Sequence, residues 1–242
     1  MEYTKEFRVP AYMVTADQFI TPEYLLKEMV DSSREHSDIA LGEEFGSSHF
    51  WILMSWVIDI MRMPRLDEKI SIRTYVAGYK KFFIYRGFEV TGPNGEQLVH
   101  AMTVWTLMDP VARALIRIPK ELFPDIDKPE KVHVPLRDFE LRPDALLIRD
   151  HFLARRSDID FNEHVNNAVY WRWVYDLVPY DQYKGLSIRR LDAEYKKEIL
   201  LGDRVLIEGR VFYREERKVF EIRILDETGE ELKALLLAEF QV

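Results

Sequence analysis

Hydrophobic and polar positions follow the same order of patterns twice along the chain. Each half opens with a strand-like stretch, at residues 7–14 and 147–155. A helix pattern follows in each half, and in the first it begins after Thr21, a residue type common at helix N-caps. Residues 71–76 and 219–224 then alternate apolar and polar positions, as strands do. We therefore expect a tandem α+β fold in which each half combines one long helix with an antiparallel meander.

The two halves also match in register. Residue 203 lies 135 positions after residue 68, and at this offset residues 67–72 align with residues 202–207. The turn-like sequences at residues 93–96 and 227–230 lie close to the same offset. Sheets of this kind can join edge to edge, which removes exposed strand edges, and we expect the two sheets to be joined in this way.

Prolines separate the halves. Five of the eleven prolines lie within residues 119–143, among charged residues. Such a stretch is incompatible with a regular helix or a central strand, so we expect an extended connection. The sequence predicts an N-terminal domain at residues 1–118, a proline-rich linker at residues 119–143 and a C-terminal domain at residues 144–242.

Composition restricts the class of protein. The 242 residues are 47% hydrophobic and 31% charged, as in a globular protein, and they include no cysteine, which excludes disulfides and a cysteine nucleophile. The net charge of −8 argues against nucleic-acid binding. The longest apolar run, residues 50–61, is too short to cross a bilayer, and the first residues lack the apolar core of a signal peptide. We expect a cytoplasmic protein with no membrane span.

Residues that can carry chemistry gather just before the second helix pattern. Asp160, Asn162 and His164 occupy alternate positions, so they share one side if the segment is extended. The N-terminus of the following helix would direct the free N–H groups around Val165 and Asn166 toward the same space. An acid, an orienting amide, a base and an oxyanion site are what acyl transfer to water requires. The pattern predicts hydrolysis of an acyl ester or thioester.

Each of these residues also has a plainer interpretation. His164 can be a core histidine held by backbone hydrogen bonds, and Asn166 or Asn167 can simply cap the helix. Asp160 can form an ion pair with a neighbouring arginine. Asp158 lies so near that the sequence alone does not separate the two aspartates, although the motif spacing favours Asp160.

A second carboxylate, Glu194, lies in a strand-like run at residues 191–199. Alternation places it on one strand face with Lys196 and Glu198. It can pair with Lys196, or it can project into an acyl-binding cavity and act as a general base. At the offset of 135 positions Glu194 falls on Asp59, but the first half has no His-Asn-Asn sequence. We therefore expect the first half to be catalytically silent.

Basic residues are concentrated around the motif. Residues 149–223 hold 15 lysines and arginines against 14 acidic residues, so the rest of the chain carries a net charge of −9. Three basic pairs lie in this part: Arg155-Arg156, Arg189-Arg190 and Lys196-Lys197. They form either an ordinary solvated surface or a docking patch for an acidic partner.

Together these residues resemble the acyl-ACP thioesterases of plants and bacteria. The resemblance rests on the motif at residues 160–170 and on the Glu-Tyr-Lys-Lys-Glu run at residues 194–198. Shorter matches lie at residues 24–26, at residues 105–109 with Arg113, and at residues 118–119. The resemblance implies a tandem (double) hotdog fold, in which two long helices are each wrapped by an antiparallel sheet.

The resemblance also implies the reaction, which is hydrolysis of fatty acyl-[acyl carrier protein] to release free fatty acid and end chain elongation. The implied catalytic residues are Asp160, Asn162, His164 and Glu194 in the C-terminal hotdog, while the N-terminal hotdog holds the acyl chain. Plant members often have a cysteine after their Glu-Tyr-Arg-Arg-Glu run, where this chain has Ile199. A water molecule activated by Glu194 or Asp160 is then the nucleophile, with Glu194 favoured.

Three rival functions stay open at this point. They are the same hydrolysis of acyl-CoA, a non-catalytic acyl-binding or regulatory role, and a dehydratase or hydratase activity on the same fold. The expected partner is acyl carrier protein, docked through the basic pairs. Because the sequence has no glycine-rich phosphate loop and no paired metal-ligand spacing, we expect no cofactor and no metal. The oligomeric state is open, a homodimer included.

Overall fold

The structure is a computed structural model that describes residues 2–42, 50–109, 114–119, 122, 134, 136, 138–140, 142 and 144–242. The chain divides into two units, Met1–Pro135 and Leu136–Val242. Most of the predicted linker lies outside the described residues, as does Arg113, so the domain limits drawn from the sequence stay predictions. No helix in the described ranges is both long enough and apolar enough to cross a membrane.

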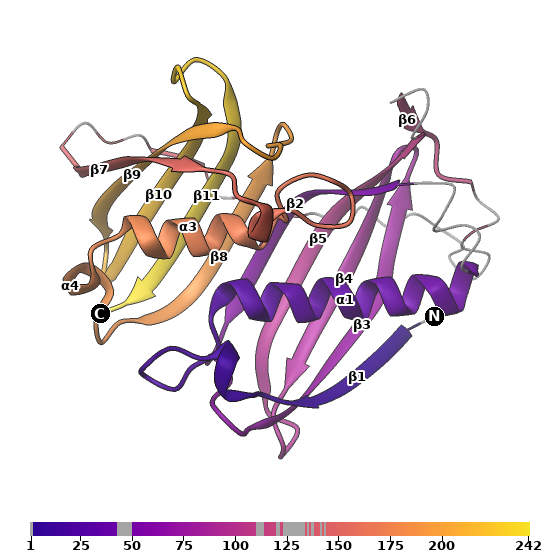
Figure 1. The fold of residues 1–242 in the computed structure, drawn as a ribbon. Helices are drawn as coiled ribbons and strands as arrows, with labels where there is room; N and C mark the ends of the chain where they lie inside the picture. The colour runs from indigo at the N-terminus through magenta and orange to yellow at the C-terminus, as the bar shows by residue number, and fades with distance from the viewer. Residues whose placement is uncertain are drawn as a thin grey trace. The chain divides into compact units, whose positions relative to one another are not determined.

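The first unit is an antiparallel sheet with one long helix across a face (Figure 1). Its strands lie in the order β1-β3-β4-β5-β2, and β6 pairs with β5. The elements are β1 (Glu2–Arg8), the 3-10 turn η1 (Ala11–Met13), α1 (Pro22–Leu41), β2 (Phe50–Ile60), β3 (Lys69–Lys80), β4 (Phe83–Thr91), β5 (Gln97–Asp109) and β6 (Ala114–Ile116).

Helix α1 begins where the sequence predicts. Thr21 is the N-cap, and its hydroxyl oxygen accepts the Tyr24 N–H at 3.3 Å while Pro22 occupies the first turn. Leu25 on the inner face of the helix is completely buried. The helix ends at Gly42, whose φ of 80° favours glycine because it has no Cβ.

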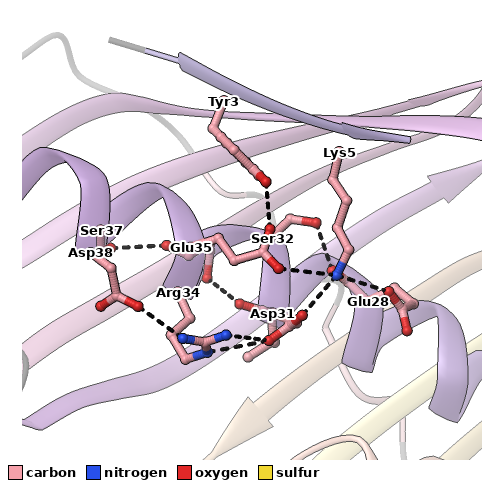
Figure 2. A network of polar contacts seen from close by, with 11 residues as sticks. Tyr3, Lys5, Glu28, Asp31, Ser32, Arg34, Glu35, Ser37 and Asp38 are labelled. Carbon is pink, nitrogen blue, oxygen red and sulfur yellow. Dashed lines mark hydrogen bonds and ion pairs between the residues drawn. The ribbon is translucent and has the colours of Figure 1, made fainter. Parts of the chain in front are cut away.

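Polar contacts fasten the strand β1 to α1 (Figure 2). Lys5 Nζ lies 3.3 Å from a Glu28 oxygen, 2.7 Å from Asp31 and 3.4 Å from Glu35. The Tyr3 hydroxyl donates to Glu35 at 2.5 Å. Partly exposed ion pairs of this kind contribute only about 0.2–1 kcal/mol each. They therefore make a small addition to the stability that β1 gains from its antiparallel hydrogen bonds with β3.

The second unit repeats the arrangement, with its strands in the order β8-β11-β10-β9-β7 and helix α3 across one face (Figure 1). The elements are β7 (Leu146–Leu153), the 3-10 turn η3 (Arg156–Asp158), α3 (Val169–Leu177), α4 (Tyr180–Tyr183), β8 (Ser187–Tyr195), β9 (Arg204–Arg214), β10 (Arg217–Asp226) and β11 (Leu232–Gln241).

The expectation of two long helices holds for α1 and fails for α3. Helix α1 has 20 residues and α3 has nine. The shorter helix stops because Pro179 follows its C-cap Val178: proline has no backbone N–H and disfavours a helical conformation in the residue before it.

The loops around the two helices repeat one backbone pattern. The Ile20 N–H donates to the Pro64 carbonyl at 2.9 Å, and the Val165 N–H donates to the Ile199 carbonyl at 2.8 Å. Val165 lies 145 positions after Ile20, while Ile199 lies 135 positions after Pro64. The offset between the two units falls from 145 positions before the helix to 135 after it, because the helical region of the second unit is shorter. Beyond the helix it equals the offset that the sequence predicts.

Candidate active site

The motif loop between η3 and α3 turns back on itself. The Asp160 N–H donates to the His164 carbonyl at 3.0 Å, and the Glu163 N–H donates to the Asp160 carbonyl at 3.1 Å. Glu163 closes the turn with a φ of 66°. An extended segment with side chains on alternate faces is therefore not what forms. The turn itself brings Asp160 to His164.

Asp160 lies beside the imidazole. Its Oδ1 atom is 3.8 Å from His164 Nδ1 and accepts the Asn162 N–H at 2.8 Å. Burial raises the pKa of Asp160 above its usual value, although the neighbouring His164 charge and the backbone N–H groups of Asn162 and His164 oppose the rise. Asn162 thus contributes its backbone N–H to the site. An orienting role for its side-chain amide stays a prediction.

Backbone groups hold His164 in place. His164 pairs with Leu200 in an isolated β-bridge, and its Nδ1 atom lies 3.3 Å from the Val165 carbonyl oxygen. If Nδ1 carries the proton, it donates to this carbonyl and leaves Nε2 as an acceptor. An imidazole in that tautomer can accept a proton or hold a water molecule.

Asp158 and Asp160 have different partners. Asp158 is buried, accepts the Arg155 N–H at 2.8 Å and forms an ion pair with Arg172. Its carbonyl also accepts the Asn166 N–H at 2.9 Å. Asp158 therefore fastens the loop to α3, which leaves Asp160 as the aspartate next to the histidine.

The two N–H groups expected to receive an oxyanion are already used by the fold. Val165 donates to Ile199 and Asn166 donates to Asp158, so the oxyanion assignment to these two groups does not fit this geometry. The capping interpretation fits instead, because Asn166 Oδ1 accepts the Ala168 N–H at 2.9 Å ahead of α3.

Glu194 lies on β8 and faces away from the motif helix. Its neighbour Tyr195 packs against Tyr170 of α3, with ring centroids 5.3 Å apart. Successive strand residues point to opposite faces, so Glu194 lies on the other face of the sheet. Its side chain is 36% exposed and forms an ion pair with Lys196. The sequence predicts that Glu194 is a carboxylate desolvated in a cavity. The structure instead places its side chain partly in solvent.

Glu198 is the second carboxylate near the motif. It immediately precedes Ile199, whose carbonyl accepts the Val165 N–H. The charges of Glu198 and Asp160 both act on the Tyr170 hydroxyl and, after burial, raise its pKa. The Val165–Ile199 bond and the His164–Leu200 bridge place Glu198, an exposed residue, next to the motif loop that holds Asp160. Strand alternation in the sequence places Glu198 on one face with Glu194 and indicates no role for it.

The first unit has the same loop with different side chains. Its loop repeats the turn, with Thr15 N–H donating to the Phe19 carbonyl at 2.9 Å and Gln18 at a φ of 65°. Four of the catalytic candidates have no counterparts there of the same chemistry, and Glu194 is the exception. Thr15, Asp17, Phe19 and Met63 stand in the positions of Asp160, Asn162, His164 and Glu198. Glu194 instead matches the carboxylate Asp59. The contrast between Glu198 and Met63 is the sequence signal that could have identified Glu198.

The basic pairs differ in exposure. Arg190 is buried, and its Nε lies 2.9 Å from Asp192 Oδ1, so the prediction that it docks a partner is wrong. Arg189 is half-buried. The remaining four side chains are exposed, and they are Arg155, Arg156, Lys196 and Lys197. Lys197 forms an ion pair with Glu231, and Lys196 pairs with Glu194. A docking role for the exposed four stays a prediction.

Two family models match the chain. The acyl-ACP thioesterase N-terminal domain matches residues 1–126, and the acyl-ACP thioesterase C-terminal domain matches residues 143–240. Among curated relatives, a palmitoyl-acyl carrier protein thioesterase of Arabidopsis thaliana is 24% identical over 213 residues, which cover 81% of this chain and 52% of the relative. A dodecanoyl-[acyl-carrier-protein] hydrolase of Umbellularia californica is 23% identical over 217 residues, which cover 81% of this chain and 56% of the relative. The chain thus spans about half the length of these relatives.

Solved structures share the fold. An acyl-ACP thioesterase from Bacteroides thetaiotaomicron is 23% identical with a TM-score of 0.82, over 99% of this chain and 98% of that one. The 12:0-ACP thioesterase from Umbellularia californica is 20% identical, also with a TM-score of 0.82, over 99% and 94%. These likenesses establish a hotdog-like fold. Since the two family models together match most of its length, the chain belongs to the acyl-ACP thioesterase family.

Proposed function

We propose that this chain hydrolyses the thioester of fatty acyl-[acyl carrier protein] and releases free fatty acid. Membership in the family supports the reaction, because relatives carry names of acyl-ACP thioesterases and hydrolases. The observation that carries the assignment to this chain is that the loop holding Asp160 and His164 pairs through its backbone with the segment that follows Glu198. The same loop in the first unit lacks all three side chains.

The reaction needs a base, a polarised carbonyl and a proton for the leaving thiol. In our proposal Glu198 takes a proton from water, and the resulting hydroxide attacks the thioester carbonyl. The tetrahedral intermediate then expels the thiolate, which is protonated as it leaves, so that acid and thiol are the products. His164 holds the water or the carbonyl oxygen, and Asp160 fixes the imidazole. General acid–base groups of this kind typically contribute about 10²–10⁴-fold in rate.

A matched pair of substitutions tests which glutamate is the base. Glu198→Gln and Glu194→Gln both remove one charge and keep the side-chain shape. We expect Glu198→Gln to lower kcat/KM by about 10²–10⁴-fold. Glu194→Gln loses only an exposed ion pair with Lys196, worth about 1 kcal/mol at most, so it should stay within a few-fold of wild type. The reverse ranking would restore Glu194 as the base, and full activity in both would refute a glutamate base.

Comparing carriers tests the substrate. Steady-state hydrolysis of the same acyl chain on acyl carrier protein and on CoA gives the two values of kcat/KM. We expect the carrier protein to be preferred, with a preference that falls as salt rises, because docking through exposed arginines and lysines is screened. A CoA preference would favour an acyl-CoA thioesterase. Tight binding of both thioesters with no release of thiol would establish a non-catalytic acyl-binding protein.

We further propose a tandem hotdog whose two sheets are joined edge to edge, with the acyl chain held by the first unit. The repeated loop pattern of the two units and the shared fold support this arrangement. A catalytically silent first unit agrees with Phe19 and Met63 at the positions of His164 and Glu198. The domain limits, a cytoplasmic location, the absence of a cofactor and the oligomeric state stay predictions.

A further inference from the structure

Four large apolar side chains around the motif loop are exposed to solvent. They are Leu153 (47% exposed), Phe161 (83%), Leu200 (49%) and Leu201 (60%). A single exposed apolar residue is ordinary on a protein surface, but several in one place usually mark an interaction site. We call these four residues the apolar patch.

The apolar patch adjoins the proposed catalytic residues. Leu200 forms an isolated β-bridge with His164, and antiparallel residues paired in this way have Cα atoms about 4.5–5.5 Å apart. Phe161 directly follows Asp160, whose N–H donates to the His164 carbonyl at 3.0 Å. A molecule that contacts Phe161 or Leu200 therefore lies beside the groups proposed to carry out the reaction.

The other two members of the apolar patch lie where β7 ends. Leu153 is the last residue of β7, and the carbonyl of the next residue, Ala154, accepts the Gly202 N–H at 3.0 Å. Leu201 directly precedes Gly202. The apolar patch thus comes from three segments of the second unit that backbone bonds hold together.

Two arginines with unpaired charges follow β7 next to the apolar patch. Arg155 and Arg156 are exposed, and within the described part of the chain neither guanidinium forms an ion pair. By contrast, Lys196 and Lys197 are each paired with a glutamate. Of the exposed basic pairs, the arginines therefore offer the positive charge that an acidic partner can neutralise.

The first unit has the same loop backbone without this patch. At the offsets of 145 and 135 positions, small or charged residues replace three of the four patch residues, and only Leu201 matches a leucine. The replaced pairs are Leu153 and Arg8, Phe161 and Ala16, and Leu200 and Arg65. The loop backbone therefore does not require exposed apolar side chains at these three positions.

We propose that the apolar patch, together with Arg155 and Arg156, is the docking surface for the acidic carrier protein that brings the thioester to the site. Acidic side chains of the carrier would pair with the two arginines, while its exposed apolar side chains would bury Phe161 and the leucines. Charge favours a small acidic protein over an anionic membrane, because the whole chain carries a net charge of −8 and an extended anionic surface would repel it. The inference rests on the proposed function, because the partner is the carrier of that same substrate.

Truncating the apolar patch tests its part in docking. Phe161→Ala copies the first unit, Leu201→Ala shortens a second member, and Ile39→Ala is a matched control because Ile39 is 71% exposed on α1. We expect each patch variant to raise KM for acyl carrier protein by about three- to tenfold at unchanged kcat, as loss of an apolar interface side chain does. KM and kcat for the same acyl chain on CoA should not change, and Ile39→Ala should match wild type on both carriers. Equal losses on both carriers would overturn the proposal.

Salt separates the apolar part of docking from the charged part. The Debye length falls from about 10 Å at 0.1 M salt to about 3 Å at 1 M. The effect of Arg155→Glu/Arg156→Glu on KM for acyl carrier protein should therefore shrink as salt rises, while the factor lost in Phe161→Ala should persist. A Phe161→Ala effect that disappears at high salt would overturn the apolar contribution.

Binding without turnover distinguishes failure of this inference from failure of the proposed function. The probe is unacylated acyl carrier protein, and its Kd is measured by fluorescence anisotropy. If Phe161→Ala and Leu201→Ala weaken binding but wild type hydrolyses no acyl thioester, the docking surface stands and the reaction is refuted. If wild type is active and both variants keep its Kd and KM, the docking surface is refuted alone.

Other occupants of the apolar patch give different results. A second copy of the chain would make wild type sediment as a dimer that Leu201→Ala converts to a monomer. A lipid surface would make wild type, but not Phe161→Ala, bind phosphatidylglycerol vesicles. Either result, with carrier-protein binding unchanged in the variants, would overturn the proposal.

Discussion

Two aspartates that are two positions apart should respond in opposite ways to the same substitution. Asp158 is buried, ion-paired with Arg172 and bonded to the Arg155 N–H at 2.8 Å. Asp160 is half-buried and lies 3.8 Å from His164. Replacing each by asparagine keeps the shape and an accepting oxygen while removing the charge. The first change should affect stability and the second should affect catalysis.

The cost at Asp158 follows from its ion pair. Breaking a fully buried pair costs about 3–5 kcal/mol. The Arg172 side chain is 34% exposed, so solvent can take over part of its interaction and we expect Asp158→Asn to cost about 1–3 kcal/mol. For a chain of this size 1 kcal/mol corresponds to about 2–4 °C, which gives a fall in Tm of about 2–12 °C. Turnover at 25 °C should stay within a few-fold.

At Asp160 the expected change in stability has the opposite sign. Burial raises its pKa in the folded state, so the folded protein holds the proton more tightly than the unfolded chain. The free energy of unfolding of wild type therefore falls as pH rises from the unfolded value through the folded one. Asp160→Asn removes that loss and should be as stable as wild type, or more stable, at neutral pH. Its kcat/KM should nevertheless fall by about 10²–10⁴-fold.

The assay combines thiol release from an acyl thioester at 25 °C with thermal unfolding at pH 5 and pH 8. Both variants and wild type are measured under the same conditions. An Asp160→Asn variant that stays active while its Tm drops would contradict a catalytic role for Asp160. An inactive Asp158→Asn variant with an unchanged Tm would contradict the structural role of Asp158 and show that it acts in the chemistry.

Three further outcomes are expected. His164→Ala should lower kcat/KM by about 10²–10⁴-fold with an unchanged Tm, measured on the same thioester; near-wild-type turnover would remove the histidine from the mechanism. The double variant Arg155→Glu/Arg156→Glu should raise KM for acyl carrier protein several-fold and leave the KM for acyl-CoA unchanged; equal effects on both carriers would show that these arginines do not dock the protein. Thr21→Ala removes the cap on the Tyr24 N–H and should cost about 1 kcal/mol in urea unfolding, and no loss would mean that the cap is not needed.

Local signals in the sequence predicted what local physics controls. The Thr21 cap of α1 and the alternating strands depend on near neighbours, and the offset of 135 positions is found by aligning the two halves; the structure has all three. The end of α3 could also have been read from Pro179. The structure therefore departs from the expectation of a second long helix for a reason visible in the sequence.

The features of the site that depend on contacts between distant segments could not be predicted from the sequence. Strand alternation separates the Glu194 face from the Tyr195 face, but it does not say which face meets the motif loop. The use of the Val165 N–H by Ile199 joins segments 34 positions apart, so its loss as an oxyanion donor was not visible in the motif. The same bond brings Glu198 to the loop, and only the comparison with Met63 would have indicated it.

The repeated loop also explains how one fold carries two different sets of side chains at the same backbone positions. Main-chain bonds such as Ile20 to Pro64 and Val165 to Ile199 define its shape, so the side chains on it can be exchanged without redrawing the backbone. The loop backbone therefore accommodates different sets of side chains. The second unit has Asp160, His164 and Glu198 at these positions and the first has Thr15, Phe19 and Met63, so acid–base groups could be introduced into the first unit by substituting side chains alone.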